Sequence, residues 1–75
     1  MRPVPNTLDF WDYLESLESR LLKFGITRDD LPGLTGFKLK TVWATLLGSP
    51  RYFSWQCLKS IAHVLEIAEQ EAARS

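Results

Sequence analysis

The chain has 75 residues, of which 45% are hydrophobic and 12% aromatic, and its formal net charge is zero. This composition predicts one small folded domain rather than a disordered chain, and no apolar run approaches the roughly 18 residues that a membrane span requires. A single cysteine, Cys57, excludes an internal disulfide framework, and without a signal-peptide pattern we expect an intracellular, cytoplasmic location.

The charges are unevenly distributed, although their sum is zero. Between Ser19 and Leu65 there are seven basic and two acidic residues, whereas the two ends together hold two basic and seven acidic residues. Helix dipoles favour acids at a helix start, which explains the acids of the first predicted helix but not those after Leu65. A basic middle between acidic ends can present a positive face to a polyanion.

The first segment, residues 1 to 6, contains Pro3 and Pro5 and is expected to be an extended, loosely held arm. Asn6 or Thr7 can then cap a helix, because their side chains accept hydrogen bonds from free backbone N–H groups. The remainder of the chain, from residue 7 to residue 75, is expected to form one helix-turn-helix domain.

The clearest helical pattern covers residues 8 to 24. Apolar residues recur there every three or four positions, which is the spacing of one helix face. They are Phe10, Leu14, Leu17, Leu21 and Phe24. Gly25 follows the last of them and is expected to end the helix.

A second, shorter helix is expected after Thr27, which can cap it with Asp30 at the third position of a capping box. Pro32 interrupts this pattern, because proline costs about 3 kcal/mol in a helix interior. Two alternatives follow: the helix starts late, near Leu31, or the segment is a distorted turn. Leu31 and Leu34 are its expected core contacts.

Residues 36 to 48 form the stretch on which the functional interpretation depends. It reads as a short helix between glycines, and Gly48 stands where a left-handed residue would end it. Its expected core stripe is Leu39, Val42, Trp43 and Leu46. The residues left for the surface are Lys38, Lys40, Thr41, Ala44 and Thr45. Such a basic face can lie in a DNA major groove, and the alternative is a core helix with solvated lysines.

The fourth helix is expected to begin after Ser54, a favourable N-cap residue. Its apolar stripe consists of Leu58, Ile61, Ala62 and Leu65. Helix propensity stays high through Ala73, and a break near Glu66 is one alternative. No segment alternates apolar and polar residues as a strand would, so the expected fold class is all-α.

The order of these residues resembles a known family. The matching run is Ile26-Thr27-Arg28-Asp29-Asp30-Leu31, Leu34-Thr35-Gly36-Phe37, Thr41-Val42, Leu46, Gly48, Pro50 and Ser54-Trp55-Gln56-Cys57-Leu58-Lys59-Ser60-Ile61-Ala62-His63-Val64-Leu65. It is similar to the lambda-repressor-like, or Xre-type, helix-turn-helix domain over roughly residues 10 to 68. The resemblance implies a bundle of four to five short helices with a helix-turn-helix at about residues 27 to 48.

The resemblance also implies a sequence-specific DNA-binding protein, such as a small transcriptional regulator, that reads the major groove with the helix at about residues 38 to 47. The expected phosphate contacts are Arg28, Lys38, Lys40 and Arg51. The expected base contacts are Lys38, Lys40, Thr41, Ala44 and Thr45. The expected partner is double-stranded DNA, bound by a homodimer on paired half-sites, because one small module buries little DNA surface.

The alternative hypothesis is a protein-interaction module on the same helical fold. The family usually carries polar residues at the positions of Leu39, Trp43 and Ala44, so apolar residues there favour contact with a protein. The expected partner interface is Leu39, Trp43 and Leu47, or the loop of Tyr52 and Phe53.

Nothing in the sequence predicts an enzyme. His63 and Cys57 lie six residues apart on one predicted helix, roughly 9 Å along its axis, which does not suit a nucleophile–base pair. No spacing of ligands is typical of a metal site. We therefore expect no catalytic residue, no metal, no cofactor, no small-molecule substrate and no membrane contact.

Overall fold

The computed structural model describes residues 8 to 74, and this part of the chain is entirely helical, without strands. The helices are α1 (Leu8–Lys23), α2 (Leu31–Thr35), α3 (Leu39–Leu47) and α4 (Trp55–Arg74). The predicted all-α fold is thus confirmed, with four helices and no break near Glu66. The predicted arm, residues 1 to 6, and the proposed caps Asn6 and Thr7 lie outside the described residues.

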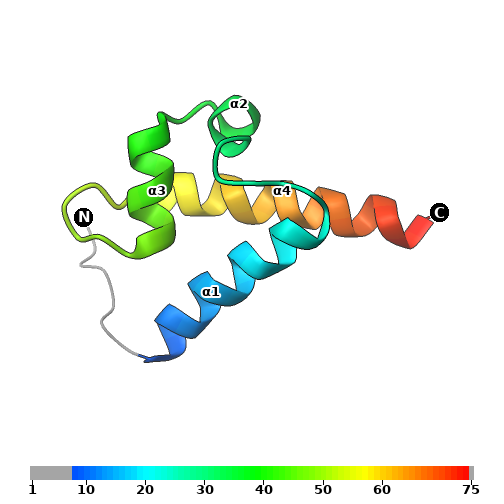
Figure 1. Ribbon diagram of the computed structural model, residues 1–75, viewed down its shortest axis with the longest axis horizontal. Coiled ribbons are helices and arrows are strands. Elements are labelled where there is room, and N and C mark those ends of the chain that lie inside the picture. The colour runs from blue at the N-terminus through cyan, green and yellow to red at the C-terminus, as the bar shows by residue number, and fades with distance from the viewer. Residues whose placement is uncertain (1–7, 75) are drawn as a thin grey trace.

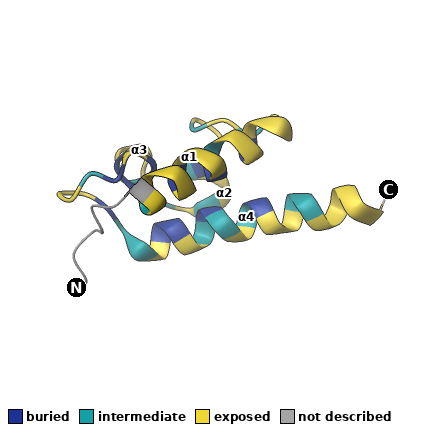
Figure 2. Cartoon of the chain, turned by 90° about the horizontal axis from the view of Figure 1, so that it is seen from below, coloured by how far each residue is buried: buried dark blue, intermediate teal, exposed yellow. Residues whose placement is uncertain are grey.

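The longest helix, α4, organises the others, because α1, α2 and α3 all pack against it (Figure 1). Helix α3 also packs against α1 and α2. The C-terminal part of α4 extends past the other helices, and its exposed turns are visible in Figure 2. Within this extension Glu69 accepts hydrogen bonds from Arg20 of α1 at 2.7 to 3.0 Å.

Two glycines separate the helices as the sequence predicts. Gly36, with φ of 80°, ends α2 and begins the short turn to α3, and its N–H donates to the carbonyl of Pro32. Gly48, with φ of 70°, ends α3, and its N–H is directed at the carbonyls of Ala44 and Thr45. Both residues adopt the left-handed conformation that glycine populates without a steric penalty.

The start of α2 distinguishes the two alternatives for this segment, because the helix does begin at Leu31 with Pro32 in its first turn. The predicted capping box at Thr27 is wrong, because the N-cap residue of α2 is Asp30 and no side chain caps the helix. The N–H and Oγ1 of Thr27 both donate to Oδ2 of Asp30 at 3.0 Å, closing the turn before the helix. These bonds favour the ionised carboxylate and so lower the pKa of Asp30.

One hydrophobic core lies between the helices. Its buried members are Leu14, Leu17, Leu21, Leu31, Val42, Leu46, Phe53, Cys57, Leu58, Ile61 and Leu65. The prediction that Phe53 belongs to a partner interface is wrong, because the residue lies in the core and only 6% of it is exposed. Its ring lies 5.8 Å from that of Phe10 and 4.9 Å from that of Trp55, centroid to centroid. These aromatic contacts fix the loop before α4 against α1.

Helix α4 begins with the predicted cap. The N–H of Cys57 donates to Oγ of Ser54 at 3.2 Å, which satisfies one of the free donors in the first turn. The backbone N–H of Ser54 donates in turn to Oγ1 of Thr45 at 3.3 Å. The start of α4 is therefore attached to α3 by a side-chain hydrogen bond as well as by the core.

Candidate interaction surface

Helix α3 is rotated relative to the prediction. Of the expected core stripe, Val42 and Leu46 are buried, but Leu39 and Trp43 face outward. The difference arises because α1, α2 and α4 all contact α3, and together they enclose the side that carries Val42, Thr45 and Leu46. The apolar residues on the opposite side, Leu39, Trp43 and Leu47, remain exposed.

Two of the expected DNA base contacts are wrong. Thr45 is completely buried, and its Oγ1 donates to the carbonyl of Thr41 at 2.7 Å while accepting the N–H of Ser54. Ala44 is also buried, at 8% exposure. Neither side chain can reach a base edge, and Thr41 itself is half-buried.

The outward side of α3 carries three large apolar residues, Leu39, Trp43 and Leu47, which we call the α3 stripe. Their exposed fractions are 46%, 41% and 50%. They are four residues apart, so their side chains are neighbours along one side of this nine-residue helix. Leu34 of α2, expected in the core, is 56% exposed.

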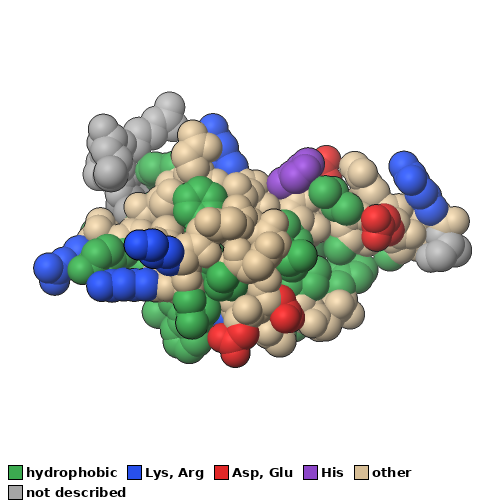
Figure 3. Space-filling model, turned by 90° about the horizontal axis from the view of Figure 1, so that it is seen from above, with side chains coloured by type: hydrophobic (Ala, Val, Ile, Leu, Met, Phe, Trp, Pro, Cys, Tyr) green, Lys and Arg blue, Asp and Glu red, His purple; other side chains and the backbone are tan. Residues whose placement is uncertain are grey.

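Three cations, Lys38, Lys40 and Arg51, define what we call the basic end. Lys38 is the N-cap of α3, where the helix dipole adds positive potential. Nζ of Lys40 lies 4.2 Å from the ring centroid of Tyr52, and Cζ of Arg51 lies 5.4 Å from the same centroid. Within residues 8 to 74 these cations form no ion pair. Figure 3 shows Lys and Arg side chains gathered at one end of the molecule, beside hydrophobic ones.

Arg28, the fourth expected phosphate contact, is engaged elsewhere. Its Nε and Nη2 donate to the two carboxylate oxygens of Glu18, with 2.8 Å between Nη2 and Oε1. Its Cζ also lies 4.8 Å from the ring centroid of Trp43. The hydrogen bonds from Arg28 hold the pKa of Glu18 below its ordinary value, although partial burial opposes this shift. Arg28 therefore connects α1 to the α3 stripe instead of joining the basic end.

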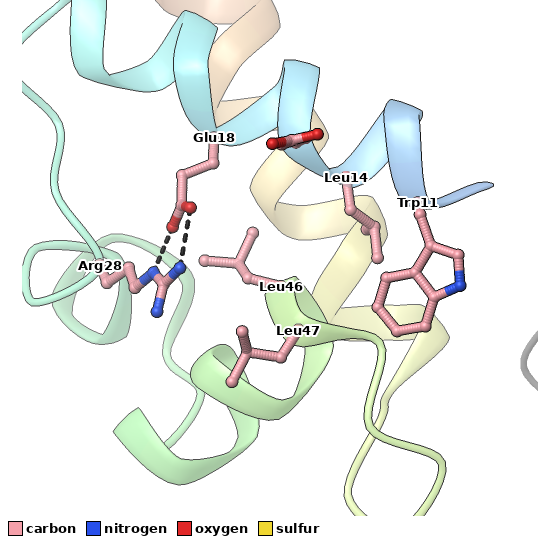
Figure 4. A pocket seen from close by; sticks show the side chains of 7 residues that line it. Trp11, Leu14, Glu18, Arg28, Leu46 and Leu47 are labelled. Carbon is pink, nitrogen blue, oxygen red and sulfur yellow. Dashed lines mark hydrogen bonds and ion pairs between the residues drawn. The ribbon is translucent and has the colours of Figure 1, made fainter. Parts of the chain in front are cut away.

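A pocket of about 290 Å³ lies between α1 and the C-terminal end of α3 (Figure 4). Its lining residues are Trp11, Leu14, Glu15, Glu18, Arg28, Leu46 and Leu47. Apolar side chains line much of it, and we call the two carboxylates, Glu15 and Glu18, the acidic edge. Within the described chain Glu15 forms no ion pair. The α3 stripe therefore begins at the basic end and finishes beside the acidic edge.

Sequence reasoning missed this pocket. The spacing of Trp11, Glu15 and Glu18 does place them on one side of α1, which is a usable signal. The sequence pattern does not indicate that this side of α1 meets Leu46 and Leu47, which lie about 30 positions further along the chain. Only the tertiary contact between α1 and α3 forms the pocket.

Catalytic and metal-binding groups are not brought together in residues 8 to 74. Cys57 is fully buried, and desolvation raises the pKa of its thiol despite an opposing hydrogen bond with Thr45. His63 lies on the exposed side of α4. No group of three potential metal ligands is present in this part of the chain. None of its helices combines the length and the apolar character of a membrane span.

We expect acid to weaken the contact between α1 and Arg28. Because the pKa of Glu18 is lowered by folding, its contribution is present above the unfolded-state value and is lost as pH falls through the folded-state value. Both side chains are partly exposed, so the loss should be about 1 kcal/mol or less. Urea unfolding of wild type and Glu18→Gln between pH 7 and pH 2.5 would measure it. The wild type should lose more stability than the variant, and parallel curves would contradict the prediction.

Comparisons with models of protein families, with curated proteins and with solved structures find no match to this chain.

Proposed function

We propose that this chain is a protein-interaction module that binds its partner through the α3 stripe and the adjacent surface. The observation that carries the proposal is the outward exposure of Leu39, Trp43 and Leu47 on one short helix. Burying a fully exposed side chain of this kind contributes about 1.5–3 kcal/mol, so covering residues that are already half-buried contributes about half of that each. Contiguous exposed apolar residues are typical of interfaces, and tryptophan is enriched among the residues that dominate binding energy.

The chemistry of α3 favours a protein over a DNA sequence as the target. Base edges are read by hydrogen-bonding side chains in the major groove. Helix α3 directs two leucines and a tryptophan outward, while Ala44 and Thr45 are buried. Of the residues expected to read bases, Ala44 and Thr45 are therefore unavailable and Thr41 is half-buried, which leaves only Lys38 and Lys40 exposed.

A second candidate function is DNA binding through phosphates, as in a small transcriptional regulator, with Lys38, Lys40 and Arg51 as the contacts. The specific observation in its favour is that Lys40 and Arg51 both lie against the Tyr52 ring, and none of the three cations forms an ion pair among the described residues. The short helix α2, a tight turn and α3 follow one another as in the helix-turn-helix family that the sequence resembles. Neutral net charge is the main argument against this candidate.

One pair of measurements tests both candidates. In the first measurement, helical peptides that bind the wild type are selected from a displayed library. Their binding to the Trp43→Ser variant is then measured. Ile67→Ser is the matched control, because Ile67 is an exposed apolar residue of α4 outside the α3 stripe. The proposal predicts that selected peptides lose binding to Trp43→Ser and keep it with Ile67→Ser. Peptides that ignore the Trp43 substitution would reject the proposed surface.

The second measurement is the salt dependence of binding to a nonspecific DNA duplex. Three phosphate contacts predict a slope of about −2.7 in log affinity against log salt, and Lys40→Glu should reduce it by about one. Under the protein-interaction proposal the duplex binds weakly or not at all at physiological salt. Tight binding with that slope, lost in Lys40→Glu and retained in Trp43→Ser, would favour the DNA candidate instead.

A further inference from the structure

We infer that the pocket between α1 and the C-terminal end of α3 binds an arginine side chain of the partner that covers the α3 stripe. This inference rests on the proposed function, because it names a residue that the same partner must carry. Leu47 belongs to the α3 stripe and also lines the pocket. A ligand that covers Leu47 therefore lies directly beside the pocket.

The volume of the pocket suits one long side chain. It is about 290 Å³, whereas sites for whole small molecules usually enclose roughly 300–1,000 Å³. Leu14 and Leu46 are buried and Leu47 is half exposed, so the lining offers aliphatic surface. The methylene stem of a long basic side chain can lie on such a surface while its charged group stays near water.

The lining carries one carboxylate without a counter-charge. Arg28 donates to both carboxylate oxygens of Glu18, so this pair has no net charge. Glu15 is exposed, and it forms no ion pair within residues 8 to 74. An acidic ligand would be repelled by Glu15, and an apolar one would displace its water without replacing the lost hydrogen bonds. The charge of the lining therefore selects a basic residue.

The chain itself shows how an arginine is held by such groups. The guanidinium of Arg28 binds the carboxylate of Glu18 and lies 4.8 Å from the ring centroid of Trp43. Trp11 and Glu15 repeat this combination of an indole and a carboxylate, because residues four apart on α1 are neighbours on one side of the helix. A guanidinium can stack on the indole and bind both carboxylate oxygens, and it is more weakly hydrated than an ammonium. Arginine is thus favoured over lysine.

A second guanidinium fits without meeting the first. Figure 4 shows Trp11 and Arg28 on opposite sides of the pocket, with Leu46 between them. A guanidinium beside Trp11 is therefore separated from Arg28, whose charge Glu18 already balances. Because the pocket adjoins Leu47, a partner helix on the α3 stripe reaches it one helical turn away from the apolar residue that covers Leu47. The expected partner helix thus carries an arginine three or four residues from an apolar residue.

The sequences of selected peptides test the inference from the side of the ligand. Helical peptides selected on wild type that depend on Trp43 should share an arginine three or four residues from an apolar residue. Replacing this arginine by citrulline, which has a similar shape but no charge, should weaken binding about ten-fold. Lysine in its place should also bind more weakly than arginine. Peptides that share an apolar residue at this position, or that tolerate citrulline, would overturn the inference.

Variants of the protein test where the arginine binds. Glu15→Gln should weaken an arginine peptide about ten-fold. Asp12→Asn is the matched control, because Asp12 is an exposed acid of the same helix outside the pocket lining, and it should change affinity by less than about two-fold. On Glu15→Gln the citrulline peptide should bind nearly as well as the arginine peptide, since both changes remove the same interaction. Losses that multiply instead would place the arginine elsewhere and overturn the inference.

These results separate the inference from the proposed function. Peptides that need Trp43 but neither an arginine nor Glu15 would overturn arginine as the ligand of the pocket and leave the α3 stripe as a docking surface. If no selected peptide depends on Trp43, the stripe fails as a docking surface and the inference fails with it.

Discussion

Replacement of Ile61 by alanine is expected to destabilise the protein by about 2–5 kcal/mol, the usual cost of removing a large aliphatic side chain from a core. Ile61 has no exposed surface and lies in the core on α4, the helix that contacts the three others. The cavity left behind cannot be filled without moving several helices at once. In a chain this small, that loss is a large share of the total stability.

Urea unfolding followed by circular dichroism would measure the effect of Ile61→Ala. Ile67→Ala is the matched control, because it makes the same change six residues further along α4 at a position that is 42% exposed. A surface change of this kind should cost no more than about 0.5 kcal/mol. Equal losses of stability for Ile61→Ala and Ile67→Ala would mean that α4 does not turn Ile61 toward the core.

The second large effect is expected for Gly48→Ala. Gly48 has a φ of 70°, and alanine there costs about 1–2 kcal/mol in backbone strain. A methyl group at this position would also lie 2.8 Å from Cη2 and Cζ3 of Trp11 and 3.4 Å from Cδ1 of Leu14. The indole must therefore shift, and the total loss should be about 2–4 kcal/mol.

Gly25→Ala separates the two causes. Gly25 has a φ of 72°, almost the same as that of Gly48, but an added Cβ meets no atom within 4 Å. This variant should therefore show only the backbone strain, about 1–2 kcal/mol. The difference between the two variants measures the close approach of Trp11 to the end of α3. If Gly25→Ala is as destabilising as Gly48→Ala, this contact contributes little.

Trp11 also links stability to the proposed interface, because it lines the pocket beside the acidic edge. Displacing its ring in Gly48→Ala should therefore also disturb the pocket at the C-terminal end of the α3 stripe.

The sequence by itself determined the elements of this protein, because their signals are local. The three- and four-residue spacing of Leu14, Leu17 and Leu21 predicts α1, and the cap at Ser54 predicts the start of α4. Gly48 predicts the end of α3, since few other residues tolerate its backbone conformation. The cost of an interior proline also predicts that α2 starts late, and α2 does begin at Leu31 with Pro32 in its first turn.

Only the tertiary structure decided which side of α3 is buried. Two overlapping sets of α3 residues could face the core. One is Leu39, Val42, Trp43 and Leu46, and the other is Val42, Thr45 and Leu46, so Val42 and Leu46 belong to both. Burial of Thr45 resolves the choice, and its hydroxyl is acceptable there because Thr41 and Ser54 satisfy it. Apolar periodicity indicates that one side of α3 is buried, but it does not specify which helices surround α3. The packing of α1, α2 and α4 around α3 leaves Trp43 exposed. The same packing places Glu15 and Glu18 of α1 beside the C-terminal end of α3.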